Sequence, residues 1–198
     1  MRAREVLIVA ILMLATPARA DDGAVADPTV RIETSLGDIT LQLDQVHAPV
    51  TVGNFLRYVN EGHFDGTVVY RVEPGFVIQA GSWDADLQVR PTHEPIALEA
   101  ANGLSNVRGS VAMARSDEPA SATAEFFINL ADNHALDHAP SDPSNNTGYA
   151  VFGKVIAGMD VVDKIASVPR GDHGPMPGAA PVEPIVIRKV FVLPSGEP

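Results

Sequence analysis

The chain has 198 residues, of which 45% are hydrophobic and 20% charged, a composition typical of one globular domain. Its 14 basic and 25 acidic residues give a net charge of −11, and no basic run is present to bind a nucleic-acid backbone. The absence of cysteine excludes disulfides, thiolate metal sites and a cysteine nucleophile. The glycine-rich patterns of nucleotide-binding loops are also absent, so we expect no nucleotide cofactor.

The first twenty residues have the three parts of a secretory signal peptide. Arg2 and Arg4 form a basic start, residues 6–15 are an uninterrupted apolar run, and Ala18-Arg19-Ala20 is a small-residue cleavage motif. A membrane-spanning helix needs about twenty apolar residues, so this run is too short to span well. We therefore expect residues 1–20 to be removed, leaving a periplasmic or secreted protein without a membrane anchor.

A polar leader and a β-hairpin follow the signal peptide. Residues 21–29 are polar and predict a flexible leader. Residues 30–35 and 39–44 alternate between apolar and polar side chains, as strands do, and Gly37-Asp38 breaks the alternation between them. This pattern predicts two antiparallel strands joined by a short turn.

Two amphipathic helices are predicted. The first runs from Pro49, and Gly62 is positioned to cap its C-terminal end; its apolar face consists of Val52, Phe55, Leu56 and Val59. The second covers residues 159–166, with Val162 and Ile165 facing the core.

The remaining apolar runs are short and bracketed by Gly, Pro, Asn or Asp, which is typical of strands. They cover residues 67–72, 76–80, 96–98, 110–114, 126–130, 149–155 and 185–193. The polar stretch over residues 134–148 predicts a surface loop. Many short strands with only two helices favour a closed or nearly closed β-barrel over a doubly wound sheet.

Four specific segments occur in order along the chain: YRVEPGFVIQAG at residues 70–81, GSVAMAR at 109–115, EFFIN at 125–129 and YAVFGK at 149–154. Together they resemble the cyclophilin-type peptidyl-prolyl cis-trans isomerases, most closely the exported bacterial branch. The resemblance covers residues 30–193 and leaves 194–198 as a C-terminal tail. It implies a mainly β fold, an eight-stranded antiparallel closed barrel capped by two α-helices, with an outer groove that binds a proline-containing peptide.

Rotation of an Xaa-Pro bond breaks no covalent bond, so its catalyst needs no nucleophile, metal or cofactor. The barrier of about 18–20 kcal/mol comes from lost amide resonance. A catalyst needs a dry socket for the proline ring and a donor directed at the proline nitrogen, which becomes basic as the bond twists. Arg71 is the candidate donor because its guanidinium is always charged and multidentate. The alternative is an ordinary solvent-facing strand arginine.

The resemblance also assigns roles to individual residues. Arg71 matches the catalytic arginine of the family, and Gln79 matches a glutamine that orders the site and contacts substrate. Ala114 and Arg115 match a stretch whose backbone pairs with the substrate, so the Arg115 side chain need not contribute. The expected lining of the proline socket is Phe76, Val77, Met113, Phe127 and Leu136, although ordinary core packing is the alternative for each.

Four positions differ from the best-known members of the family. Tyr70 and Tyr149 each stand where histidine is usual, Ala135 where Trp or Phe is usual, and Glu125 where Gln is. The missing ring at Ala135 implies weaker binding of cyclosporin. Tyr149, on the pocket rim, and Glu125 are still expected to bind substrate. We expect the Glu125 carboxylate to pair with Arg71 and orient it, the alternative being a solvated glutamate at a strand start.

Other chemistry has weaker support in the sequence. His134 and His138 are four residues apart, but they lie in the predicted loop close to Pro140 and Pro143, and no third ligand is evident. We therefore predict no metal site. Ser, His and Asp are all present, but the GxSxG motif of a hydrolase is not.

The sequence therefore predicts a monomeric peptidyl-prolyl cis-trans isomerase for exported proteins. Its partners would be unfolded or extended proline-containing polypeptides, isomerised during folding without a covalent intermediate or cofactor. Two alternatives remain open. A proline-peptide binding module or chaperone would use the same groove with little turnover, and an extracytoplasmic interaction protein would meet its partner through its acidic surface.

Overall fold

The computed structural model describes residues 27–139, 147–172 and 174–194. The predicted signal peptide, most of the predicted leader and nearly all of the C-terminal tail lie outside these described residues. Thr29, the last residue of the predicted leader, is already paired in the first strand.

The first two strands, β1 (Thr29–Thr34) and β2 (Gly37–Leu43), form the hairpin that the alternating pattern predicts. The Thr34 hydroxyl donates a 2.7 Å hydrogen bond to the Gly37 carbonyl and tightens the turn. Gly37 has a φ of +138°, and a Cβ atom there would lie 2.8 Å from Val161. Only glycine fits this turn without strain.

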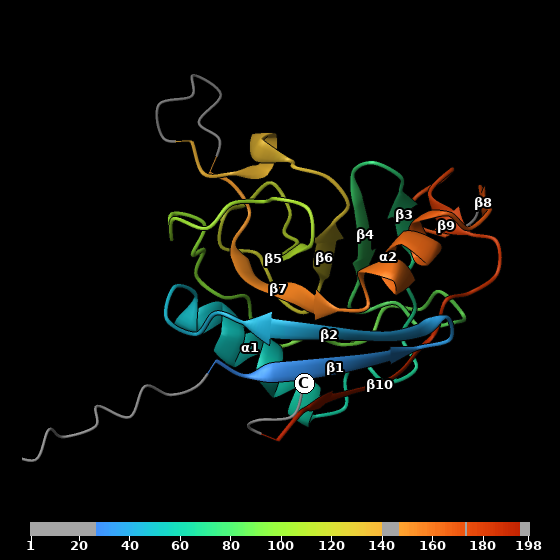
Figure 1. Ribbon diagram of the computed structural model, residues 1–198, viewed down its shortest axis with the longest axis horizontal. Coiled ribbons are helices and arrows are strands. Elements are labelled where there is room, and N and C mark those ends of the chain that lie inside the picture. The colour runs from blue at the N-terminus through green and yellow to red at the C-terminus, as the bar shows by residue number, and fades with distance from the viewer. Residues whose placement is uncertain (1–26, 140–146, 173, 195–198) are drawn as a thin grey trace, which may run out of the picture.

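One eight-stranded antiparallel sheet, in the order β10-β1-β2-β7-β5-β6-β4-β3, forms most of the fold (Figure 1). Its other strands are β3 (Arg71–Glu73), β4 (Val77–Ala80), β5 (Ser110–Met113), β6 (Phe126–Asn129), β7 (Val151–Ala157) and β10 (Ile187–Val192). Two short strands, β8 (Arg170–Gly171) and β9 (Ala180–Pro181), pair separately. The strand order confirms the mainly β architecture.

The sheet is an open half-barrel, so the prediction of a closed barrel is wrong. Its edge strands, β10 and β3, form no ladder with each other. Only the bridge between Val68 and Val186 and a few backbone hydrogen bonds join residues 66–69 to residues 185–187. The predicted strand at residues 67–72 becomes regular only from Arg71, and three residues are too few to complete the ring.

Two α-helices flank the sheet (Figure 1). The first helix, α1 (Pro49–Asn60), packs against β10, and α2 (Met159–Ala166) packs against β2, β3 and β4. Gly62 follows α1 with a φ of +67° and donates its N–H to the Val59 carbonyl, as the predicted glycine cap requires. The predicted surface loop holds a 3₁₀ turn, η1 (His134–Leu136), and its residues 140–146 lie outside the described chain.

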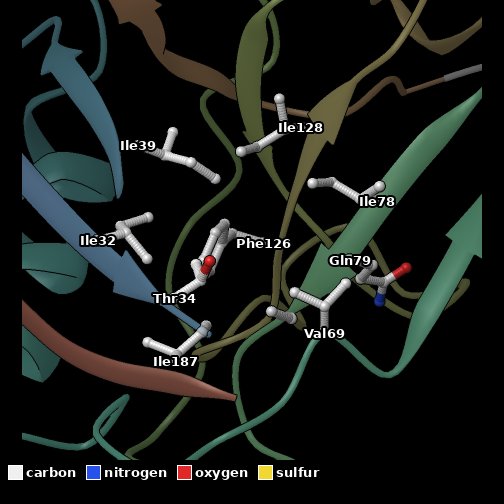
Figure 2. A pocket seen from close by; sticks show the side chains of 10 residues that line it. Ile32, Thr34, Ile39, Val69, Ile78, Gln79, Phe126, Ile128 and Ile187 are labelled. Atoms are coloured by element: carbon white, nitrogen blue, oxygen red, sulfur yellow. The ribbon is translucent and has the colours of Figure 1, made fainter. Parts of the chain in front are cut away.

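Side chains fill the inside of the half-barrel. The Phe55 ring lies 5.1 Å from those of Phe64 and Phe152 and 5.4 Å from that of Phe126. Figure 2 shows the isoleucines of several strands converging beside Phe126, and the space left among them is about 20 Å³. A cavity of this size holds no ligand larger than a water molecule. A larger ligand must therefore bind outside this packed interior.

Alternate residues of the same strands form a second apolar cluster on the outer face, which we call the outer cluster. Its buried members are Val77, Ala112, Phe127 and Val151. Because strand side chains point alternately to the two faces, Ile78 and Ile128 fill the interior while Val77 and Phe127 face outward. The outer cluster forms the base of the candidate site.

Candidate active site

A groove of about 270 Å³ lies over the outer cluster, and every residue that lines it is one the sequence singled out. The lining consists of Arg71, Phe76, Val77, Gln79, Ala114, Arg115, Phe127, Leu136 and Tyr149. These residues come from β3, β4 and the turn between them, from β6 and η1, and from the chain just after β5 and just before β7. Segments far apart in the sequence therefore build one outer-face site.

The register of the strands brings the polar and apolar parts of the groove together. In the β3–β4 pair Arg71 lies opposite Gln79, and in the β4–β6 pair Gln79 lies opposite Phe127. An arginine, a glutamine and a phenylalanine are thus placed in a row across three neighbouring strands. This row puts hydrogen-bond donors at one side of an apolar surface.

The apolar part of the groove is a socket between β4, β6 and η1. Phe127 and Tyr149 meet edge to face, with ring centroids 5.6 Å apart. Phe76 and Leu136 are partly buried beside them, and Val77 is buried beneath. These apolar side chains can take up a small ring away from water.

Met113, expected to line the socket, instead belongs to the interior. It is 2% exposed and packs in the main core, whereas its neighbour Ala112 belongs to the outer cluster. The alternation along β5 explains the difference, because Ala112 and Met113 face opposite sides of the sheet. The Met113 side chain is therefore not part of the groove.

The Arg71 guanidinium is held from two sides. Glu73 Oε1 accepts hydrogen bonds from Nε at 2.7 Å and from Nη2 at 2.5 Å, and Gln79 Oε1 accepts one from Nη1 at 3.0 Å. The guanidinium carbon also lies 5.8 Å from the centre of the Phe76 ring. Since a guanidinium carries five N–H bonds, one on Nη1 and one on Nη2 stay available. A donor thus lies directly beside the socket.

Glu73 is the carboxylate that pairs with Arg71, so the prediction that Glu125 does so is wrong. Glu73 lies two residues along the same strand, and period-two alternation puts both side chains on one face of β3. That spacing could have identified the pair from the sequence. Glu125 is separated from Arg71 because Gln79 and Tyr70 lie between them.

Glu125 has its own polar surroundings behind the groove. Its Oε1 accepts a 2.8 Å hydrogen bond from the Ser82 backbone N–H, and its Oε2 is buried with no hydrogen-bond partner among the described residues. Burial raises the pKa of the Glu125 carboxyl, and the nearby Tyr70 hydroxyl and the Ser82 N–H oppose that rise. Burial, with the nearby Glu125 charge, also raises the pKa of the Tyr70 hydroxyl, which therefore stays protonated.

The Arg115 side chain lines the groove, although the resemblance required only its backbone. Its Nε donates to the Gly148 carbonyl at 2.9 Å and its Nη2 to the Thr147 hydroxyl at 2.9 Å. Its guanidinium carbon lies 4.7 Å from the centre of the Tyr149 ring. These contacts tie the end of β5 to the segment before β7 and hold Tyr149 at the rim.

Ala135 and the neighbouring histidine contribute no reactive group to the groove. Ala135 is exposed on η1, next to Leu136, and a single methyl group takes the place of a large ring there. The Ser105 hydroxyl and the Asp137 carboxylate both meet the same nitrogen of His134, Nδ1. A Ser-His-Asp hydrolase needs the serine and the carboxylate on different ring nitrogens, so this cluster lacks that arrangement.

Two further observations concern the described residues alone. Within them, no group of three or more His, Asp or Glu side chains is arranged to hold a metal ion. No helix in the same part of the chain combines the length and the apolar character needed to cross a bilayer.

The fold and the groove define a class of protein: an antiparallel half-barrel with a packed interior and an outer peptide-sized groove, in which one arginine lies beside an apolar socket. The family model described as cyclophilin-type peptidyl-prolyl cis-trans isomerase matches residues 29–192. The chain belongs to this family, and it is a peptidyl-prolyl cis-trans isomerase.

Named bacterial relatives are similar over most of their length. The chain is 48% identical to peptidyl-prolyl cis-trans isomerase A of Dickeya dadantii over 164 residues, which cover 83% of this chain and 84% of the relative. It is 45% identical to peptidyl-prolyl cis-trans isomerase B of Escherichia coli over 163 residues, which cover 82% of this chain and 98% of the relative.

A solved structure has the same fold at much lower sequence similarity. The cyclophilin-type isomerase of Cryptosporidium parvum superposes with a TM-score of 0.67 at 23% identity, covering 85% of this chain and 99% of the other. A second structure of that protein, determined in the presence of the dipeptide Ala-Pro, also has a TM-score of 0.67.

The Glu73–Arg71 pair generates the first prediction. Glu73→Ala removes the acceptor of two Arg71 hydrogen bonds, and because both side chains are partly exposed we expect kcat/KM to fall only about two- to fivefold. Glu73→Gln keeps a carbonyl oxygen in the same place and should retain most of the activity. Isomerisation of a short proline peptide measures both. Equal loss in the two variants would show that charge, and not hydrogen bonding, is what Glu73 provides.

The raised pKa of Glu125 generates a prediction about stability. The folded chain binds the Glu125 proton more tightly than the unfolded chain, so ionising this carboxyl costs stability as pH rises from the ordinary glutamate pKa through the raised one. Relative to wild type, Glu125→Gln should gain free energy of unfolding over that window and lose the gain below it. Urea unfolding between about pH 4 and 8 measures the difference.

Glu118→Gln, at an exposed position, is the control for losing one negative charge. A Glu125→Gln difference that does not change with pH would contradict the assignment of a raised pKa to this carboxyl.

Proposed function

We propose that this isomerase acts outside the cytoplasm on Xaa-Pro bonds of unfolded or extended polypeptides and helps exported proteins to fold. The observation that carries the proposal for the site is the Arg71 guanidinium beside the apolar socket, with two N–H bonds left available. The support for export is the basic, apolar and small-residue pattern of the first twenty residues.

In the proposed mechanism the proline ring enters the socket. Phe127 and Leu136 surround the ring on opposite elements, β6 and η1, and exclude water from it. The groove is open at the surface, so the rest of the polypeptide stays extended along it. Main-chain groups near Ala114 then lie within reach of the substrate backbone, which would make binding independent of most client side chains.

Arg71 would then stabilise the twisted bond. As the amide rotates, its nitrogen loses conjugation and becomes a better hydrogen-bond acceptor, so a donor at this point binds the transition state more strongly than the ground state. A thousandfold acceleration requires about 4 kcal/mol. One hydrogen bond from a charged donor supplies about 1.5–3 kcal/mol. Positioning of the ring by the socket would supply the rest.

The second candidate function is that of a proline-peptide binding module, which binds its client polypeptides with little turnover. The observation that favours it is Glu73, which occupies Nε and Nη2 of Arg71 and reduces the positive field at the groove. Such a module would keep the socket and the same clients, and it would function by holding them.

Arg71→Ala distinguishes the two candidates. Removing one preorganised donor of this kind costs about 10²- to 10³-fold in rate, so we expect kcat/KM to fall by that factor. Affinity for a proline peptide should change little, because the socket remains. A protease-free isomerisation assay and a peptide titration measure the two quantities.

Arg57→Ala is the matched control, because Arg57 also pairs with a carboxylate, Glu61, but lies on α1 away from the groove. Full activity in Arg71→Ala would remove Arg71 from the mechanism. A wild-type rate that does not exceed the uncatalysed rate would favour the binding module.

Export has its own test. When the full chain is produced in a Gram-negative bacterium, the protein recovered from the periplasm should begin at Asp21, as N-terminal sequencing and intact mass can determine. Leu12→Arg interrupts the apolar run and should leave the uncut chain in the cytoplasm. Uncut wild-type protein confined to the cytoplasm would refute the proposed location.

A further inference from the structure

A row of polar side chains leads away from the groove, and the mechanism above does not use its far end. Beyond Arg71, the Gln79 amide is hydrogen-bonded to the Tyr70 hydroxyl, and the Glu125 carboxyl lies next to Tyr70. Tyr70 is 6% exposed, and the Glu125 Oε2 atom is buried with no hydrogen-bond partner among the described residues. Buried polar groups are costly unless they are paired, so such a row requires a physical reason.

Donor and acceptor chemistry fixes the direction of the two hydrogen bonds that join Arg71, Gln79 and Tyr70. Arg71 can only donate, so Gln79 must turn its Oε1 atom toward it. The Gln79 amide nitrogen then faces the Tyr70 hydroxyl and donates to its oxygen. The Tyr70 hydrogen can then turn to an acceptor, and the buried Glu125 Oε2 atom, which has no hydrogen-bond partner among the described residues, is a nearby one. An ionised carboxylate can never donate.

We propose that Tyr70 and Glu125 form a positioning pair that fixes the orientation of the Gln79 amide and thereby keeps an acceptor against the Arg71 guanidinium. The pair touches neither the substrate nor the reacting bond. It acts on the reaction through Gln79, and the inference rests on the proposed role of Arg71.

Packing prevents the pair from separating. The Tyr70 ring lies against Trp83, with centroids 5.7 Å apart, and the Glu125 carboxylate is anchored to the Ser82 backbone N–H. A Cβ atom on Gly81 would lie 2.6 Å from the Ala124 carbonyl oxygen, so the chain after β4 and the chain before β6 are in close contact. The carboxylate is thus held at a fixed place relative to Tyr70.

Reversing the hydrogen-bond directions in the row would remove an acceptor from Arg71. If residue 125 could donate a hydrogen bond, the Tyr70 oxygen could accept it and turn its own hydrogen toward Gln79. The Gln79 amide would then flip and place its NH₂ group against the Arg71 Nη1, so that a donor faces a donor. Arg71 would lose its acceptor on that side and would be held by Glu73 alone.

The test uses single and double variants. Glu125→Gln, which can donate, and Tyr70→Phe, which lacks the hydroxyl, should each lower kcat about 3- to 10-fold, as expected for the loss of one hydrogen bond. KM for a proline peptide should stay nearly unchanged, because the socket is intact. The double variant should lose no more than the worse single variant, since both residues act through Gln79.

A pH profile adds a readout that a purely structural role would not change. The side chains that face Glu125 are those of Tyr70, Gln79 and Ser82, with Arg71 beyond Gln79. Because the row requires an ionised carboxylate, kcat/KM of the wild type should fall on acidification through the raised pKa of Glu125. Glu125→Gln should lack this acidic limb.

Two matched controls separate positioning from stability. Glu99 accepts backbone hydrogen bonds from Val50 and Thr51 at the start of α1, and the hydroxyl of the buried Tyr58 accepts one from His93. Glu99→Gln and Tyr58→Phe should lower stability without changing kcat. The proposal is overturned if Glu125→Gln matches Glu99→Gln in kcat, or if losses at Tyr70 and Glu125 are additive. The role of Arg71 itself is judged separately, by Arg71→Ala.

Discussion

The fixed position of one guanidinium is the constraint on which the site depends. Arg71 and Gln79 lie opposite each other in the β3–β4 pair, so the ladder of the sheet sets the distance between their side chains. Glu73 holds the other side of the guanidinium from the same strand. A long flexible side chain is thereby restricted before any substrate arrives, and restriction of this kind is what makes a donor effective in a transition state.

The packed interior explains why the site lies on the outer face. Strands β4, β5, β6 and β7 each contribute to two clusters, and the inner one leaves only about 20 Å³ of space. The same strands must therefore present their functional side chains outward. Ile78 and Gln79 are adjacent on β4, yet one stabilises the core and the other belongs to the groove. The same alternation of side chains along the strands therefore builds both the core and the site.

Specific sequence segments could predict the groove, but they could not predict contacts that depend on three-dimensional register. The string around Arg71 and Gln79 identified the lining because its residues occupy positions fixed by the family. Which face of the sheet Met113 occupies depends on the pleat of β5. Whether the barrel closes depends on the length of β3, which is only three residues. The prediction that Glu125 pairs with Arg71 failed because Gln79 and Tyr70 lie between the two side chains in the folded sheet, and the order of residues along the chain does not show this.

The charges around Arg71 are consistent with a catalyst that depends more on the orientation of its hydrogen-bond donor than on a net positive charge. The chain carries a net charge of −11, and Glu73 pairs directly with the guanidinium. An Xaa-Pro amide is neutral in its ground state, so a strong uncompensated field would gain little before the bond twists. A compensated guanidinium still presents polarised N–H bonds, whose strength rises when the proline nitrogen becomes basic. The carboxylate that reduces the field is therefore also the group that directs the donor.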